Sequence, residues 1–143
     1  SGSYDRSLAA IEQAIDEYPS IQIVIDLHRA SILTDDGQAY KTSCTINGEE
    51  MAQLMFVVGT DDGGLTHPNW QDNLNYVTGL QYKLNRAYPG LMRPVNLRTQ
   101  RFNQHVRAGS MLIEVGSSGN TMPEALAAIR LFGQTLADDL NDV

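Results

Sequence analysis

The amino-acid sequence predicts an α/β fold, in which a mixed β-sheet is flanked by helices on both faces and carries a β-hairpin insertion. Three observations predict it. A helix-patterned segment leads through Pro19 into a β-branched run, two strand-like segments flank Asn47-Gly48, and two long segments carry apolar residues at helical spacing. The 143 residues suit one domain, and 42% hydrophobic with 19% charged residues is a globular composition.

The first two elements are a helix and a strand. Residues 5–18 carry apolar side chains at helical spacing, with Ser3 or Asp5 as the expected cap and Pro19 as the stop. Residues 21–27, with the sequence IQIVIDL, form a short β-branched run that predicts a buried strand.

A hairpin is expected in the middle of the chain. Residues 39–46 alternate, Asn47-Gly48 is a two-residue turn signal, and residues 50–58 continue as a second strand. This hairpin is expected to extend or cap the sheet. Cys44, the single cysteine, falls in the first of these strands, so the chain can form neither an internal disulfide nor a cysteine-based zinc ribbon.

The second half of the chain is expected to form two helices and two strands. These are helices 69–88 and 122–140 and strands 93–98 and 110–115. We place both strands in the centre of the sheet with residues 21–27. Thr121 and Glu124, three residues apart before an apolar stripe, match a capping box at the start of the last helix.

Charge and hydropathy exclude several classes of function. The net charge is −7 and the ten basic residues are scattered, which argues against binding to nucleic acid. No apolar run approaches the roughly 18 residues of a membrane-spanning helix. The first 20 residues are polar and mixed in charge, which is unlike a signal peptide.

A candidate functional site lies at the end of the strand 21–27, because sites in open α/β sheets gather at the carboxyl ends of strands. His28 at this end could serve as a metal ligand, a general base or a structural histidine. Asp26 lies two positions earlier on the same face of the strand. It could hold the imidazole or cap a neighbouring backbone amide.

Glu114 is a second candidate, because it interrupts the apolar run Met111–Val115. A carboxylate in such a place is costly unless it is paired, hydrogen-bonded or bound to a metal, and its raised pKa suits a general base. The alternative is an edge strand with Glu114 facing water. The other two histidines are weaker candidates: His67 is expected at the surface, and His105 is expected to contact substrate.

Three short motifs occur in a characteristic order along the chain. They are IDLHR at 25–29, LIEVG at 112–116 and the pattern Asn120, Thr121, Glu124, Ala125. Together they resemble the stage II sporulation protein P family of cell-wall hydrolases over almost the whole chain. That family is related to the zinc-dependent N-acetylmuramoyl-L-alanine amidases, so the resemblance implies an amidase type 3-like fold.

The resemblance also implies an activity and a cellular setting. The expected reaction is hydrolysis of the amide between the lactyl group of N-acetylmuramic acid and L-alanine in peptidoglycan, with cross-link endopeptidase activity also attributed to the family. The expected partners are a lytic transglycosylase and a membrane protein of the engulfment machinery. The full-length protein is expected to be extracytoplasmic and anchored in the forespore or mother-cell membrane.

Individual residues match the family pattern. His28 matches a zinc-ligand histidine, and Glu114 matches the catalytic glutamate that would take a proton from zinc-bound water. We assign Arg29, Asn103 and His105 to substrate binding and Asp26 to the support of His28.

The family pattern also needs an earlier histidine and glutamate as zinc ligands, and the chain lacks them. Ala30 stands where members often have Asp. We therefore expect residues 1–143 to be the C-terminal portion of one zinc amidase domain, with Zn²⁺ bound firmly only in the complete domain. The missing strands should leave one edge or face of the sheet bare, which invites self-association into a homo-oligomer.

Two other functions remain open. One is a non-catalytic module that binds peptidoglycan or a partner protein, which the missing ligands favour. The other is a zinc carboxypeptidase-like hydrolase in which His67 or His105 supplies a further ligand.

Overall fold

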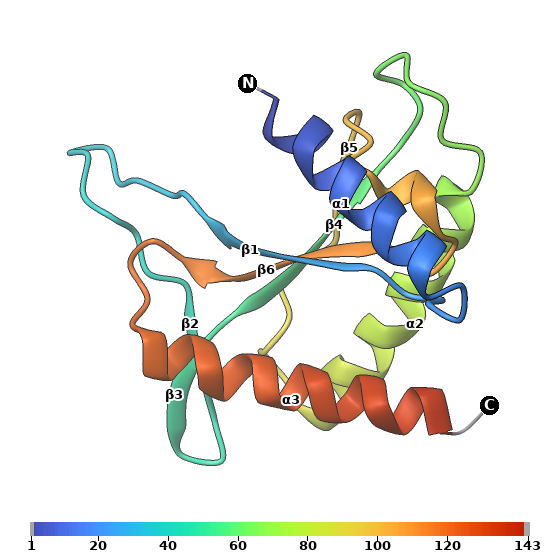
Figure 1. Cartoon of the computed structure of the whole chain (residues 1–143). Helices are drawn as coiled ribbons and strands as arrows, with labels where there is room; N and C mark the ends of the chain where they lie inside the picture. Colours follow the sequence, from blue (N-terminus) through green and yellow to red (C-terminus); the bar gives the residue numbers. More distant parts are fainter. Residues whose placement is uncertain (1, 142–143) are drawn as a thin grey trace.

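The structure, a computed structural model, describes residues 2–141 and has an α/β fold with a mixed sheet and three α-helices (Figure 1). Its elements in chain order are α1 (Ser3–Glu17), β1 (Ile25–Ala30), β2 (Ser43–Ile46), β3 (Glu49–Ala52), β4 (Leu54–Gly59), α2 (Trp70–Ala87), β5 (Asn96–Arg98), the short 3-10 helix η1 (Gln104–Val106), β6 (Met111–Ser117) and α3 (Met122–Asn141). The fold class predicted from the sequence is confirmed.

The main sheet has four strands in the order β1-β6-β4-β5. β1 runs parallel to β6, β6 antiparallel to β4, and β4 parallel to β5. The prediction that residues 21–27 and 93–98 form central strands is therefore wrong, because β1 and β5 lie at the two edges. β4 takes the central place because five of its six residues are buried, whereas β5 has no buried residue.

The hairpin around Asn47-Gly48 is confirmed. β2 and β3 pair antiparallel across this turn, and both turn residues have the positive φ that a two-residue hairpin loop requires. The predicted second strand, residues 50–58, divides at Gln53. There the chain leaves the hairpin and continues as β4 in the main sheet, so the hairpin is joined directly to a central strand.

β1 begins four residues later than predicted and includes the residues expected after its end. Its ladder with β6 starts at the pair Ile25–Met111, and residues 21–24 form no strand. β1 lies at an edge and pairs with β6, so its extent follows that of β6, from the pair Ile25–Met111 to the pair Ala30–Ser117. Asp26 and His28 therefore lie within the strand.

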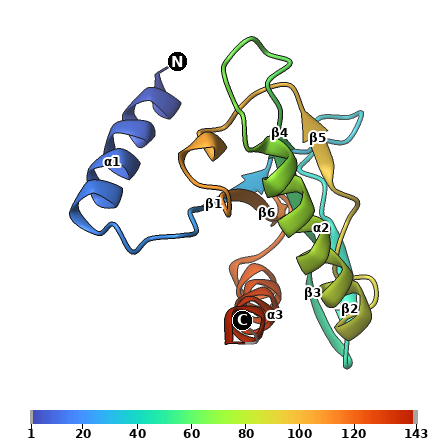
Figure 2. The same ribbon diagram turned by 90° about the vertical axis from the view of Figure 1, so that its right-hand side faces the viewer.

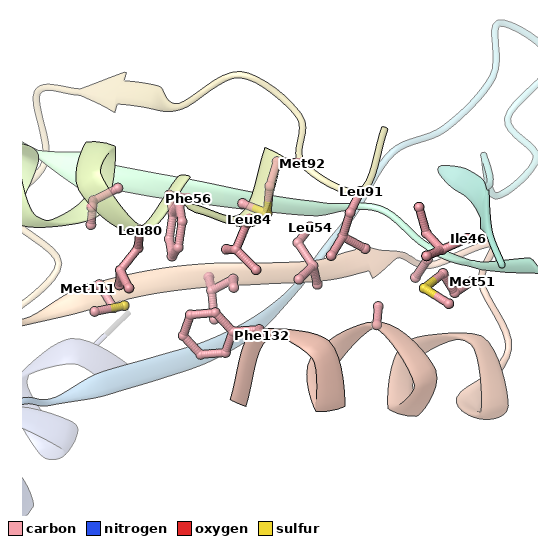
Figure 3. Packing of buried hydrophobic residues seen from close by; sticks show 14 of the residues in the cluster. Ile46, Met51, Leu54, Phe56, Leu80, Leu84, Leu91, Met92, Met111 and Phe132 are labelled. Carbon is pink, nitrogen blue, oxygen red and sulfur yellow. The ribbon is translucent and has the colours of Figure 1, made fainter. Parts of the chain in front are cut away.

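The hydrophobic core fills one face of the sheet. Phe56 of β4 and Ile113 of β6 are cross-strand partners on this face, and Phe132 of α3 packs against Phe56 with ring centroids 5.9 Å apart (Figure 3). α2 adds the buried residues Val77, Leu80 and Leu84, and α3 adds Ala128 and Phe132. The predicted capping box is present, since the Thr121 backbone amide donates to a Glu124 carboxylate oxygen and the Glu124 amide donates to Thr121 Oγ1.

α1 differs from the other two helices. It begins at Ser3 after Gly2, which has a left-handed backbone conformation and gives no side-chain cap, so the expected cap at Ser3 or Asp5 is not formed. None of its residues is buried, and Figure 2 shows it set apart from α2 and α3. Tyr4 in its first turn stacks on His28 of β1, on the face of the sheet opposite to the core, so helices flank both faces as predicted. No helix in residues 2–141 has the length and apolar character needed to span a bilayer.

Candidate active site on the open face of the sheet

The pleat of the sheet brings three candidate residues to one face. Residues that are paired across a ladder share a face, and Asp26 and His28 of β1 pair with Leu112 and Glu114 of β6. Ile25 and Leu27 alternate to the other face, with the core residues Met111 and Ile113 as their partners. Asp26, His28 and Glu114 therefore lie together on the face away from α2 and α3, which we call the open face.

Asp26 contacts the imidazole of His28. Asp26 Oδ2 lies 3.0 Å from His28 Nε2, and both side chains are 38% exposed. When the neutral imidazole donates its Nε2–H to this carboxylate, the lone pair resides on Nδ1. Such a carboxylate–imidazole pair fixes the tautomer and orientation of a histidine that binds a metal or a proton through its other nitrogen.

Glu114 is half-buried and incompletely hydrogen-bonded. Its Oε2 atom is inaccessible to solvent and has no hydrogen-bond partner among residues 2–141. Burial raises the pKa of its carboxyl group; the nearby charges of His28 and Arg93 oppose the rise, and that of Asp26 adds to it. A carboxylate with a raised pKa holds a proton more strongly than an ordinary glutamate, which is the property of a general base.

Two aromatic rings cover the site. The ring of Tyr4, from the start of α1, stacks on the His28 ring with centroids 6.5 Å apart. Phe102 packs edge-on against Tyr4 at 5.7 Å. Tyr4 was not among the residues predicted for the site, and its position at the start of the predicted first helix was the available signal. Burial raises the pKa of the Tyr4 phenol, and the charges of Asp26 and Glu114 raise it further.

Comparison with known proteins identifies the family. A sequence model described as stage II sporulation protein P matches residues 1–137. The chain belongs to the stage II sporulation protein P family. It is 28% identical to the stage II sporulation protein P of Bacillus subtilis (strain 168) over 145 residues, which cover 95% of this chain and 34% of the relative. The chain thus spans about a third of the length of that relative. No solved structure matches it.

Arg29 does not join the candidate site of this sporulation-family chain. It follows His28 on the strand, and its guanidinium donates to the carbonyl oxygens of Ser117, at 3.0 Å, and Asn120. These bonds tie the edge strand β1 to the turn before α3. Substrate binding by Arg29 stays a prediction, and its observed contacts are with the protein's own backbone.

Asn103 and His105 also have partners of their own. Asn103 is buried, and its amide nitrogen donates to the Tyr4 carbonyl oxygen at 2.7 Å and to Ser7 Oγ at 3.1 Å. His105 lies in η1 with its ring centroid 6.5 Å from that of His67. Their contact with substrate stays a prediction, since Asn103 is used to hold α1 and His105 lies beside His67.

The expectation that His67 lies at the surface is wrong. Its exposed fraction is 1%, and burial lowers the pKa of its imidazole. Asn73, fully buried in the first turn of α2, places its amide nitrogen 3.4 Å from His67 Nε2 and donates to the Gln104 carbonyl oxygen. The polar neighbourhood of His67 therefore suggested exposure, whereas tertiary packing encloses it.

The described residues do not complete a metal site. No group of three or more His, Cys, Asp or Glu side chains within residues 2–141 is arranged to hold a metal ion. His28 offers one nitrogen, and the His67–His105 pair has no third ligand there. The residues present thus do not by themselves fit the zinc that the family resemblance implies.

Proposed function

We propose that this chain carries the general base of a peptidoglycan hydrolase that acts in spore engulfment. The proposed reaction is hydrolysis of the amide between the lactyl group of N-acetylmuramic acid and L-alanine, with cross-link cleavage as a further activity. The observation that carries the proposal is the position of Glu114. It is half-buried beside His28 on the open face, with one carboxylate oxygen unpartnered within the described residues.

Glu114 would accept a proton from the attacking water and return it to the leaving amine. Its raised pKa supports both halves of this transfer, because the group must first bind the proton and then release it. Asp26 would hold the His28 imidazole by its Nε2–H and leave Nδ1 available. Family membership supports a role in sporulation, whereas the chemistry assigned to these side chains is our proposal.

We place Zn²⁺ in the full-length protein, with His28 as one ligand and the others outside residues 2–141. This part of the proposal predicts that the full-length protein binds zinc and that His28→Ala weakens binding, measured as metal content after dialysis. Unchanged zinc content in His28→Ala would remove His28 from the ligand set.

The proposed setting follows the family resemblance. We propose that the full-length protein is membrane-anchored, faces outward, and works on peptidoglycan together with a lytic transglycosylase and a membrane partner. Within residues 2–141, β1 has one strand neighbour, and Leu27 on it is 60% exposed, so we also propose that this edge can pair two copies of the chain.

The decisive experiment uses the full-length protein with zinc on purified peptidoglycan. Glu114→Gln should reduce product release by about 10²–10⁴-fold, the usual contribution of a general base. Glu49→Gln is the matched control, because Glu49 is an exposed glutamate on β3 away from the open face. Mass spectrometry of the products should find free L-alanine amino termini. Full activity in Glu114→Gln would overturn the proposal.

A non-catalytic cell-wall binding module is the second candidate. It is favoured by the incomplete metal-ligand set within residues 2–141. In that case, the chain sediments with cell walls in the absence of zinc, and the full-length protein releases no peptides under any metal condition.

A further inference from the structure

An apolar groove lies next to the open face, and neither His28 nor Glu114 lines it. It is formed between the start of α1, the loop after β4 and the loop after β5, which meet at one end of the molecule (Figure 1). Tyr4, Leu8, Leu65 and Phe102 give it apolar walls, and Asp5 and Arg101 supply charges of opposite sign. Leu65 is 58% exposed, so its side chain is available to a ligand.

Backbone contacts hold the two loops of the groove together. The Gly63 amide donates to the Thr99 carbonyl oxygen at 3.0 Å, and a Cβ atom at Gly63 would lie only 2.5 Å from that oxygen. Only glycine allows this close approach. Since Asn103 also bonds to the first turn of α1, all three walls are joined, and the groove exists before any ligand binds.

The groove is continuous with the candidate active site through Tyr4. The Tyr4 ring lines the groove and also stacks on His28, so a ligand in the groove lies one ring away from the imidazole. Phe102 and Asn103, which complete this wall, are consecutive non-glycine residues with φ of 50° and 56°. Backbone in this left-handed region is costly and is concentrated at functional sites.

The chemistry of the walls favours a peptide over a sugar. The contacts of Tyr4 with His28 and Phe102 reduce the aromatic surface on which a sugar could stack. Leu8 and Leu65 offer alkyl surface suited to amino-acid side chains. Arg101 has a guanidinium nitrogen bonded to the Thr66 carbonyl oxygen and forms no ion pair within residues 2–141, so its charge remains available to a carboxylate.

We propose that this groove binds the peptide stem of peptidoglycan, with a stem carboxylate near Arg101 and an amino group near Asp5. The peptide class rests on the proposed function. Peptide stems combine small alkyl side chains with carboxylates and, at the diamino acid, an amino group. The groove offers matching apolar surface and charges, and it would place a bound stem beside His28 and Glu114.

The test is a titration of the isotope-labelled chain, followed by amide chemical shifts, with three probes. These are N-acetylmuramoyl pentapeptide, the free stem pentapeptide and N-acetylmuramic acid alone. We expect both peptide probes, but not the sugar, to shift the amides of Gly63, Thr99 and Arg101. Leu65→Glu should weaken binding of the peptide probes about tenfold or more, because it puts a charge into the apolar wall. Leu97→Glu, at a leucine that is 51% exposed outside the groove, should leave binding unchanged.

Equal shifts with the sugar alone, no groove shifts with any probe, or binding unaffected by Leu65→Glu would each overturn this assignment. The titration needs no catalysis, so its result is separate from that of the proposed function. A groove that binds peptide while Glu114→Gln keeps full hydrolysis would reject only the general base. A hydrolase that depends on Glu114 but shows no groove binding would reject only the subsite.

Discussion

The two faces of the main sheet are made by alternating residues of the same strands, yet they are covered in different ways. On the core face, Phe56 and Ile113 are fully buried beneath α2 and α3. On the open face burial is uneven: Val57 and Leu112 are buried, whereas Met55 and Glu114, next to Phe56 and Ile113 along their strands, are only partly buried. The difference teaches that stability and candidate chemistry are divided between faces, one residue apart along each strand.

Substitutions on β4 should give the largest contrast between the faces. Phe56→Ala should lower the free energy of unfolding by about 3–5 kcal/mol, because it leaves a cavity opposite Phe132. Met55→Ala, the adjacent residue on the open face, should cost much less. Urea denaturation of both variants measures the contrast. Equal losses would show that the open face is also part of a closed core in solution.

The helices of the two faces should differ in local stability. α1 buries no residue, whereas α3 buries Ala128 and Phe132. Amide hydrogen exchange should therefore be much faster in α1 than in the middle of α3, because local opening of α1 exposes little apolar surface. Similar protection in the two helices would contradict the division between faces.

The cap of α3 should make its stability depend on pH. Hydrogen bonds from Lys41, Asn120 and the Thr121 amide lower the pKa of Glu124 to about 2. Since this pKa lies below the unfolded value of about 4.5, the contribution of Glu124 is present above pH 4.5 and is lost as the pH falls towards 2. Thermal melts of Glu124→Gln should show a loss of stability at pH 7 that shrinks in acid. Glu49→Gln, the control on β3, should show little change at either pH.

Glu114→Gln should have the smallest effect on stability. The substitution keeps the shape of the side chain and removes a half-buried carboxylate, one oxygen of which has no hydrogen-bond partner in the described part of the chain. We expect the free energy of unfolding at pH 7 to stay within about 1 kcal/mol of the original or to rise slightly. Denaturation midpoints measure it. A loss comparable to that of Phe56→Ala would indicate that Glu114 is held by the fold and is not reserved for chemistry.

The elements that could be predicted from the sequence are those specified locally. Each depends on residues a few positions apart. Examples are the capping box of Thr121 and Glu124, the turn at Asn47-Gly48 and the apolar stripe along α2. Strand order depends on contacts between distant segments. For that reason the break at Gln53 and the edge positions of β1 and β5 could not be inferred from local patterns.

The site was predictable residue by residue but not as an arrangement. His28 stood out at the end of a predicted strand and Glu114 within an apolar run, yet only the register of β1 and β6 places them side by side. Tyr4 reaches His28 from a separate helix, and no spacing rule connects the two. His67 lies in a polar stretch of sequence, which predicted exposure. It is buried in the structure, where it contacts Asn73 of α2, and local sequence does not reveal that contact.

The alternation of Ile113 and Glu114 along β6 also disfavours a shift in the register of this strand. If β6 slipped by one residue along its neighbours, Ile113 and Glu114 would exchange faces. A carboxylate would then enter the packed layer beneath α3, and an isoleucine would face solvent, which is costly on both sides. A chain in which β6 had slipped, with Glu114 no longer beside His28, would therefore be unstable. The same burial of apolar side chains that stabilises the native fold also fixes the arrangement of the candidate site.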